Sequence, residues 1–199
     1  QVLTGKHDIA EAVYLHRSGT RLVLASIALN DLKRLDIGKL KRAVDDLDGS
    51  TEFVVLDSPP GLSKEASAVI SVADEAIVVT NPEMPAVTDA LKTIKLCKQL
   101  GTKVRGVIVT KTNVKNADMP LKDIEEVLEE SIIGVIPEDR AVKFSHAAKD
   151  AVVHTHPKSA AAVQYKQLAA EVADIKYREV VDAQRGPVTE FLLRWFGFK

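Results

Sequence analysis

The apolar positions of the chain gather in short runs of strand length, and longer stretches with helical spacing separate them. Five runs rich in valine and isoleucine do not alternate with polar residues; they span 21–26, 52–57, 75–80, 103–110 and 131–136. Such runs are typical of strands buried on both faces. They predict a mainly parallel sheet whose strands are joined by right-handed crossovers.

The intervening stretches predict helices, at 36–47, 63–72, 87–100, 121–130 and 159–177. Ser63 follows a Pro-Pro-Gly turn and is the predicted N-cap of its helix. Because strands and helices alternate, the predicted fold class is α/β, with helices on both faces of the sheet. We predict one domain over residues 1–184, followed by a separate segment, 185–199, that begins at a Gly-Pro break.

The composition is that of a soluble globular protein, with 46% hydrophobic and 28% charged residues. A formal net charge of −1 supplies no overall field that would draw the chain onto nucleic acid. The single cysteine, Cys97, lies in an amphipathic stretch and is expected to be a buried thiol. Neither a signal peptide nor a membrane-spanning run is present, so we expect a cytoplasmic protein.

The segment after residue 187 has a composition of its own and holds four of the nine aromatic residues of the chain. At 100° per residue, its bulky apolar side chains form one stripe, and Leu193 lies off that stripe. The segment predicts an amphipathic helix that binds an anionic membrane surface. The predicted membrane-binding residues are Phe191, Leu192, Arg194, Trp195, Phe196 and Lys199. The alternative is a terminal helix packed on its own domain or on a partner.

Three predicted strands end in loops that carry polar side chains. The loops are Asp57 with Ser58, Pro59, Pro60 and Gly61; Thr80 to Glu83; and Pro137 with Glu138 and Asp139. In open α/β sheets, ligands bind beyond the carboxyl ends of the strands. An aspartate there can order a water on Mg²⁺, so Asp57 is a candidate magnesium residue. The alternatives are a capping role for Asp57 and, for Glu138 and Asp139, stabilisation of a helix N-terminus.

Other constellations are weak. His154 and His156 have no further Cys or His near them in sequence, no serine lies in a GxSxG elbow, and neither GxxxxGK[ST] nor GxGxxG occurs. The chain therefore holds half of a magnesium–phosphate site without a phosphate-binding loop. The first residue is Gln1 and not methionine, so either the chain was processed or part of its N-terminus is absent.

Taken in order, the motifs DSPPG, VTNPE, GVIVT and IIGVIPED, followed by a basic amphipathic tail, resemble the MinD branch of the MinD/ParA family of deviant Walker-A P-loop ATPases. The resemblance runs from Val2 to Lys199. It implies that a glycine-rich phosphate-binding loop precedes Gln1, and the alternative is a form of the fold that has no such loop. The resemblance further implies a P-loop NTPase-like fold, the cofactors ATP and Mg²⁺, and an ATP-dependent homodimer that hydrolyses ATP. It also implies a role in placing the cell-division site or another cellular component, with a regulator protein as partner.

The resemblance also implies roles for single residues. Asp57 would be the catalytic Walker B-type aspartate that acts on Mg²⁺ through water, and Ser58 to Gly61 would form a switch turn that senses the γ-phosphate. Pro137, Glu138 and Asp139 would line the adenine pocket. Thr110 and Lys111 stand where the family usually has Asn-Arg. Thr110 lacks the donor and acceptor pair of an amide, which weakens the expected selectivity for the base.

We therefore expect the intact protein to be a MinD-like ATPase that binds the inner face of the cell membrane peripherally and reversibly. The 199 residues alone, without the loop, are expected to be inactive. One alternative is a non-hydrolysing membrane-bound adaptor of the same fold. Another is a ParA-like DNA-segregation ATPase, against which the charge and the tail argue; no sequence-specific nucleic-acid binding is expected. An iron–sulfur carrier would need a Cys-x-x-Cys pair.

Overall fold

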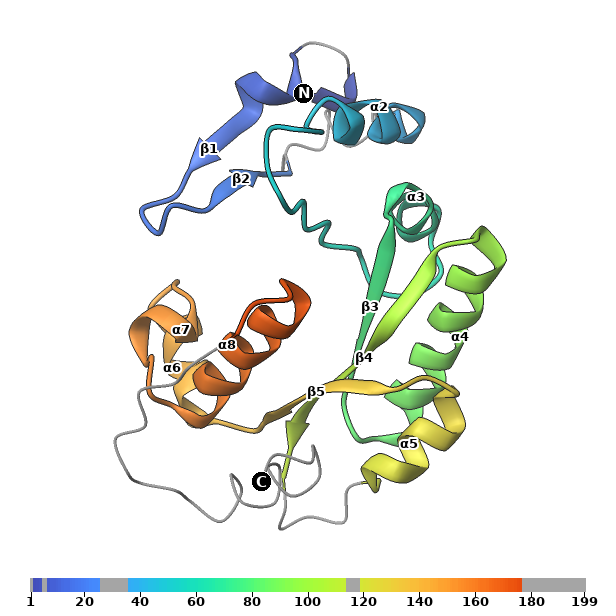
Figure 1. Ribbon diagram of the computed structural model, residues 1–199, viewed down its shortest axis with the longest axis vertical. Helices are drawn as coiled ribbons and strands as arrows, with labels where there is room; N and C mark the ends of the chain where they lie inside the picture. Colours follow the sequence, from blue (N-terminus) through green and yellow to red (C-terminus); the bar gives the residue numbers. More distant parts are fainter. Residues whose placement is uncertain (1, 5–6, 26–35, 114–118, 177–199) are drawn as a thin grey trace. The chain divides into compact units, whose positions relative to one another are not determined.

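A computed structural model describes residues 2–4, 7–25, 36–113 and 119–176 (Figure 1). The chain divides into two compact units. The first unit holds the described residues up to Ala76 together with Lys92–Arg105, and the second holds Ile77–Leu91 with the described residues from Gly106 onward. The predicted boundary between residues 184 and 185 lies outside the described residues.

A three-stranded sheet forms from the apolar runs in the second half of the chain. Its strands are β3 (Glu75–Thr80), β4 (Lys103–Thr112) and β5 (Ile132–Pro137), in the spatial order β3-β4-β5. Strands β4 and β5 are parallel, with Val107 opposite Ile132. These three strands and the α/β fold with a parallel sheet are therefore confirmed.

Helices follow each of these strands; the spacing of apolar residues predicts those at 84–100, 121–128 and 160–172 but not those at 140–147 and 152–155. The helices are α4 (Met84–Leu100), α5 (Leu121–Leu128), α6 (Arg140–Ala147), α7 (Val152–Thr155) and α8 (Ala160–Val172). The central residues of β4, from Gly106 to Val109, are all buried, so both faces of this strand are covered. On one face, Ala161 and Leu168 of α8 pack against Ile108 and Ile136.

Glycine permits the close packing of β4 and β5 and of α8 on the sheet. A Cβ atom at Gly134 would lie 3.0 Å from a methyl carbon of Leu168 in α8. A Cβ atom at Gly106 would lie 2.5 Å from Cγ2 of Ile133 and 3.0 Å from the Ser131 carbonyl oxygen. Any larger residue at these two positions requires a neighbour to move.

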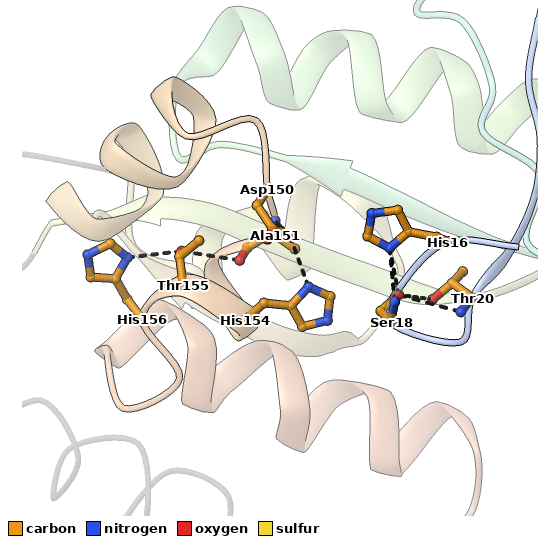
Figure 2. A network of polar contacts seen from close by, with 8 residues as sticks. All are labelled: His16, Ser18, Thr20, Asp150, Ala151, His154, Thr155 and His156. Carbon is orange, nitrogen blue, oxygen red and sulfur yellow. Dashed lines mark hydrogen bonds and ion pairs between the residues drawn. The ribbon is translucent and has the colours of Figure 1, made fainter.

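The first unit begins with short elements: η1 (Val2–Thr4), η2 (Ile9–Ala12), β1 (Val13–Leu15), β2 (Arg21–Val23), η3 (Ile37–Lys39), α2 (Leu40–Asp45) and α3 (Lys64–Val72). Strands β1 and β2 form an antiparallel hairpin. Figure 2 shows how its turn is held: the Ser18 hydroxyl lies 2.9 Å from Nδ1 of His16 and 3.0 Å from the Thr20 hydroxyl.

Two predictions about strands are wrong. Residues 21–26 were expected to form a buried strand of the parallel sheet, but residues 21–23 pair with β1 in the antiparallel sense, and Leu24 is 71% exposed. Residues 52–57 lie in no ladder of the described residues, and Val55 is 91% exposed. An apolar run becomes a buried strand only where a neighbouring strand supplies backbone partners and a helix covers its face.

The helix predictions are confirmed at the level of elements. Residues 37–45, 64–72, 84–100, 121–128 and 160–172 are helical. Ser63 caps α3 as predicted, because its side chain accepts a hydrogen bond from the Ala66 N–H at 3.1 Å. The predicted C-terminal amphipathic helix and its membrane-binding residues lie outside the described residues. Within the described part of the chain, no helix has both the length and the hydropathy to cross a bilayer.

Candidate functional site

The carboxyl ends of β4 and β5 meet and bring two groups of predicted site residues together. Thr112 lies opposite Pro137 in the ladder. The Glu138 N–H donates to the Thr112 carbonyl at 2.9 Å, and the Thr112 hydroxyl donates to the Ile136 carbonyl at 3.4 Å. Thr110 and Lys111 are therefore placed beside Pro137 and Glu138, at the edge where open α/β sheets bind ligands.

Lys111 occupies an irregular point of this edge. The ladder between β4 and β5 shifts register between Val109 and Thr112, and Lys111 has a φ of 56°. A lysine in the left-handed region is uncommon, and bulges of this kind re-aim side chains next to functional sites. Its side chain is exposed and available to an anionic ligand.

The hydroxyl of Thr110 donates a hydrogen bond to a neighbouring strand of the sheet. The hydroxyl donates to the carbonyl oxygen of Thr80, the last residue of β3, at 3.2 Å. A hydroxyl that donates in this way retains lone pairs and can still accept a hydrogen bond. Thr110 is thus an acceptor toward a ligand, which accords with its lack of the paired donor and acceptor of an amide.

The side chain of Asp139 is bound by protein groups. One carboxylate oxygen accepts from the Ala141 N–H at 2.8 Å and caps α6, and the other accepts from the Ala161 N–H at 3.1 Å. Partial burial raises the pKa of Asp139, but these two N–H groups, the Ser159 hydroxyl and nearby His156 outweigh it and hold the pKa below its ordinary value. The alternative of a stabilised helix N-terminus is therefore confirmed for Asp139.

The short helix α7 is braced by its own polar side chains, as Figure 2 shows. Asp150 accepts from the Ala151 N–H at 2.8 Å and lies 3.0 Å from Nδ1 of His154. The Thr155 hydroxyl donates to the Ala151 carbonyl at 3.2 Å and lies 3.0 Å from Nδ1 of His156. The His156 ring in turn stacks on Phe144 of α6, with the centroids 6.4 Å apart. This network holds His156 near Asp139.

The turn that carries Asp57 belongs to the first unit. Asp57 and the residues up to Gly61 are exposed, and the Ser58 hydroxyl donates to the Pro59 carbonyl at 3.2 Å. Gly61 has a φ of 81°, which glycine adopts without strain. Because Ser63 caps α3, the alternative in which Asp57 caps this helix is wrong.

The donor set at Asp57 fits magnesium better than a metal that needs a cluster of protein ligands. The described residues contain no group of three or more His, Cys, Asp or Glu that could hold an ion. Mg²⁺ is commonly bound by one or two carboxylates, several waters and the phosphates of a substrate. An exposed aspartate beside a serine hydroxyl suits this mode, in which Mg²⁺ would neutralise phosphate charge.

Comparison with protein families defines the class. A family model described as "ParA: NUBPL iron-transfer P-loop NTPase" matches residues 37–173. The chain therefore belongs to the ParA/MinD family of P-loop NTPases. Iron transfer through thiolates would require cysteine ligands; the 199 residues hold one cysteine, Cys97, which is buried in α4.

Individual relatives agree with this class. The chain is 34% identical to an uncharacterized ATP-binding protein of Methanocaldococcus jannaschii over 98% of its own length and 75% of that protein. It is 30% identical to a putative septum site-determining protein MinD of Guillardia theta, with the same two coverages. The solved structure of MinD with Mg-ADP from Pyrococcus horikoshii matches with a TM-score of 0.81 and 27% identity, over 86% of this chain and 71% of that one.

Sequence reasoning missed two participants at the edge of the sheet. Thr112 supplies the carbonyl that binds Glu138, and α8 supplies the N–H of Ala161 that binds Asp139. Thr112 could have been suspected, since it directly follows Lys111. The contact between Asp139 and Ala161 joins residues 22 apart in sequence and has no local signal.

Proposed function

We propose that the intact protein is an ATPase of the MinD type, with ATP and Mg²⁺ as ligands. The observation that carries this proposal is the similarity of the fold to MinD solved with Mg-ADP, together with the Thr110–Lys111 and Pro137–Glu138 pairs at one edge of the sheet. Family membership supports the hydrolysis of a nucleoside triphosphate. Septum site determination, the role in the name of the Guillardia theta relative, supports a function in spatial positioning.

In this proposal the residues divide the work by chemistry. Thr110 and the backbone of Pro137 and Glu138 contact the base, and Lys111 adds positive charge. Asp57 acts on Mg²⁺ through water, and Ser58 to Gly61 respond to the γ-phosphate. A threonine whose proton is already donated favours the exocyclic amino group of adenine, a donor, over the O6 of guanine, an acceptor.

We extend the proposal to membrane binding by the C-terminal segment. ATP closes a homodimer, two amphipathic segments then bind an anionic membrane together, and hydrolysis releases them. One short helix binds marginally, whereas two linked helices gain avidity. The protein would thus be cytoplasmic and peripherally associated with the inner face of the membrane, and a regulator protein would stimulate hydrolysis.

Sedimentation with anionic liposomes tests the function. The intact protein should co-sediment with liposomes in Mg-ATP and much less in Mg-ADP, and Trp195→Glu should abolish the difference. Leu193→Glu is a matched control, because it places the same charge off the apolar stripe and should weaken binding less. The membrane mechanism would be contradicted if both variants lost liposome binding equally. It would also be contradicted if binding were the same in Mg-ATP and Mg-ADP. Absence of ATP binding would contradict the ATPase itself.

A further inference from the structure

The carboxylate of Asp139 links the first turns of two helices that are distant in sequence. One oxygen binds the Ala141 N–H of α6 at 2.8 Å, and the other binds the Ala161 N–H of α8 at 3.1 Å. The first N–H groups of a helix have no partner within the helix, and an anion beside them is stabilised. Asp139 meets this need for α6 and α8 together, so its side chain joins the two helices.

The surroundings of this link are tightly packed. Ala161 and Ala162 at the start of α8 are completely buried, and Ala141 is 8% exposed. Ala162 and Ala141 belong to one cluster with Val152 of α7, and Ala161 belongs to the cluster beneath α8 on the sheet. A shift of α8 relative to α6 would disturb both clusters. The carboxylate therefore lies between two helices, α6 and α8, that have little freedom to move relative to each other.

Asp139 is also next to the backbone that the proposed function uses. The preceding residue, Glu138, donates its N–H to Thr112 of β4 at 2.9 Å, and Pro137 lies opposite Thr112 in the ladder. The Glu138 side chain is half-exposed, and its Oε1 lies 3.7 Å from Nζ of Lys143. The loop from Pro137 to Asp139 is thus held at one end by β4 and at the other by the starts of α6 and α8.

We propose that Asp139 is a positioning residue for nucleotide binding, which acts by tying the loop Pro137–Glu138 to the first turn of α8 and touches no ligand itself. This proposal rests on the proposed function and replaces the expectation that Asp139 lines the adenine pocket. An aspartate suits this position because each of its two carboxylate oxygens accepts a hydrogen bond from a different helix. A residue with one short acceptor could cap α6 but would leave the buried Ala161 N–H without its acceptor.

The substitution Asp139→Ser separates these two roles. Serine is a good N-cap and keeps a bond to the Ala141 N–H, but it is too short to reach Ala161 as well. In the intact protein, the KM for ATP and the Kd for Mg-ADP should rise about tenfold, while kcat stays within about twofold, because a binding loop and not a reacting group is displaced. Asp139→Asn, which also caps α6, should behave in the same way and provides a second variant if the first does not fold.

Glu125→Ala, which removes the acceptor, provides a matched control for loss of stability. Glu125 of α5 also accepts a backbone N–H from another element, that of Ile132 at 2.9 Å, but at the opposite end of β5. This variant should lower the thermal midpoint while leaving KM and kcat unchanged. If Asp139 had a purely structural role, its variants would also have a lower thermal midpoint and an unchanged KM. That result would overturn the proposal.

The outcomes distinguish the two proposals. If the unaltered intact protein binds ATP and the Asp139 variants bind it equally well, the positioning role is wrong and the ATPase stands. If the unaltered protein binds no nucleotide, the proposed function itself is wrong. A fall in kcat at unchanged KM would show that Asp139 acts on the reaction and not on binding, which also contradicts the positioning role.

Discussion

At the scale of single residues, Gly106 shows how strictly one position can be determined. Its φ is 157°, which side chains rarely adopt, and a Cβ atom would approach the Ser131 carbonyl as well as Ile133. We expect Gly106→Ala to lower the free energy of unfolding by about 1–3 kcal/mol, measured by urea denaturation. The reason is a clash with backbone that cannot withdraw.

Gly101→Ala is the control for this prediction. Gly101 has a φ of 80° and nothing within 4 Å of its Cβ position, so alanine there meets backbone strain without a clash. It should cost about 1 kcal/mol. If Gly106→Ala costs no more than Gly101→Ala, the packing of β4 against β5 is looser than the structure indicates.

At the scale of elements, an ion-pair cluster connects the first residues of β3 and β4. Lys103 donates to one oxygen of Glu75 at 2.6 Å, and Arg105 donates to the other at 3.2 Å. The hydrogen bond from Lys103 lowers the pKa of Glu75 from its ordinary value of about 4.5 more than desolvation raises it, and Arg105 adds to the lowering. The cluster ties neighbouring strands together at the end of the sheet opposite to the candidate site.

The cluster predicts a pH dependence of stability. A carboxylate with a lowered pKa stabilises the fold above its unfolded pKa, and this contribution disappears as pH falls through the folded pKa. The thermal midpoint of the unaltered protein should therefore exceed that of Glu75→Gln at pH 6–7, and the difference should shrink below about pH 4.5. A difference that is constant between pH 7 and pH 3 would show that the charge of Glu75 is irrelevant. Because the groups are largely exposed, high salt should also reduce the difference.

Strand-length apolar runs were a reliable guide only where at least one neighbouring strand lies within the described residues. Residues 75–80, 103–110 and 131–136 are the confirmed strands, and each bonds to another member of this set. Residues 52–57 have the same pattern of apolar side chains but no backbone partner in the described chain, and Phe53 is 49% exposed. The pattern of apolar residues indicates which faces a segment can bury. Whether the segment pairs with another strand depends on residues elsewhere in the chain.

At the scale of the whole molecule, the proposal makes a prediction about turnover. The 199 residues contain no GxxxxGK[ST] sequence, the loop whose backbone amides and lysine hold the β- and γ-phosphates in P-loop proteins. We expect the purified 199-residue chain to release no phosphate from ATP above background, in a coupled phosphate assay. The intact protein should show turnover under the same conditions. Turnover by the 199 residues alone would contradict this view of the site.

The sequence by itself determined the α/β class, five of the helices, three strands of the parallel sheet and the family, because hydrophobic periodicity, caps and ordered motifs are local signals. It also predicts site residues where apolar runs end, at Asp57, Thr110 and Pro137, and these site residues stay predictions. Only the tertiary structure decided that the hydroxyl of Thr110 is donated to Thr80, that Lys111 lies where the β4–β5 ladder shifts register, and that Asp139 also binds α8. These facts depend on bonds between residues far apart in the chain, which no local pattern encodes.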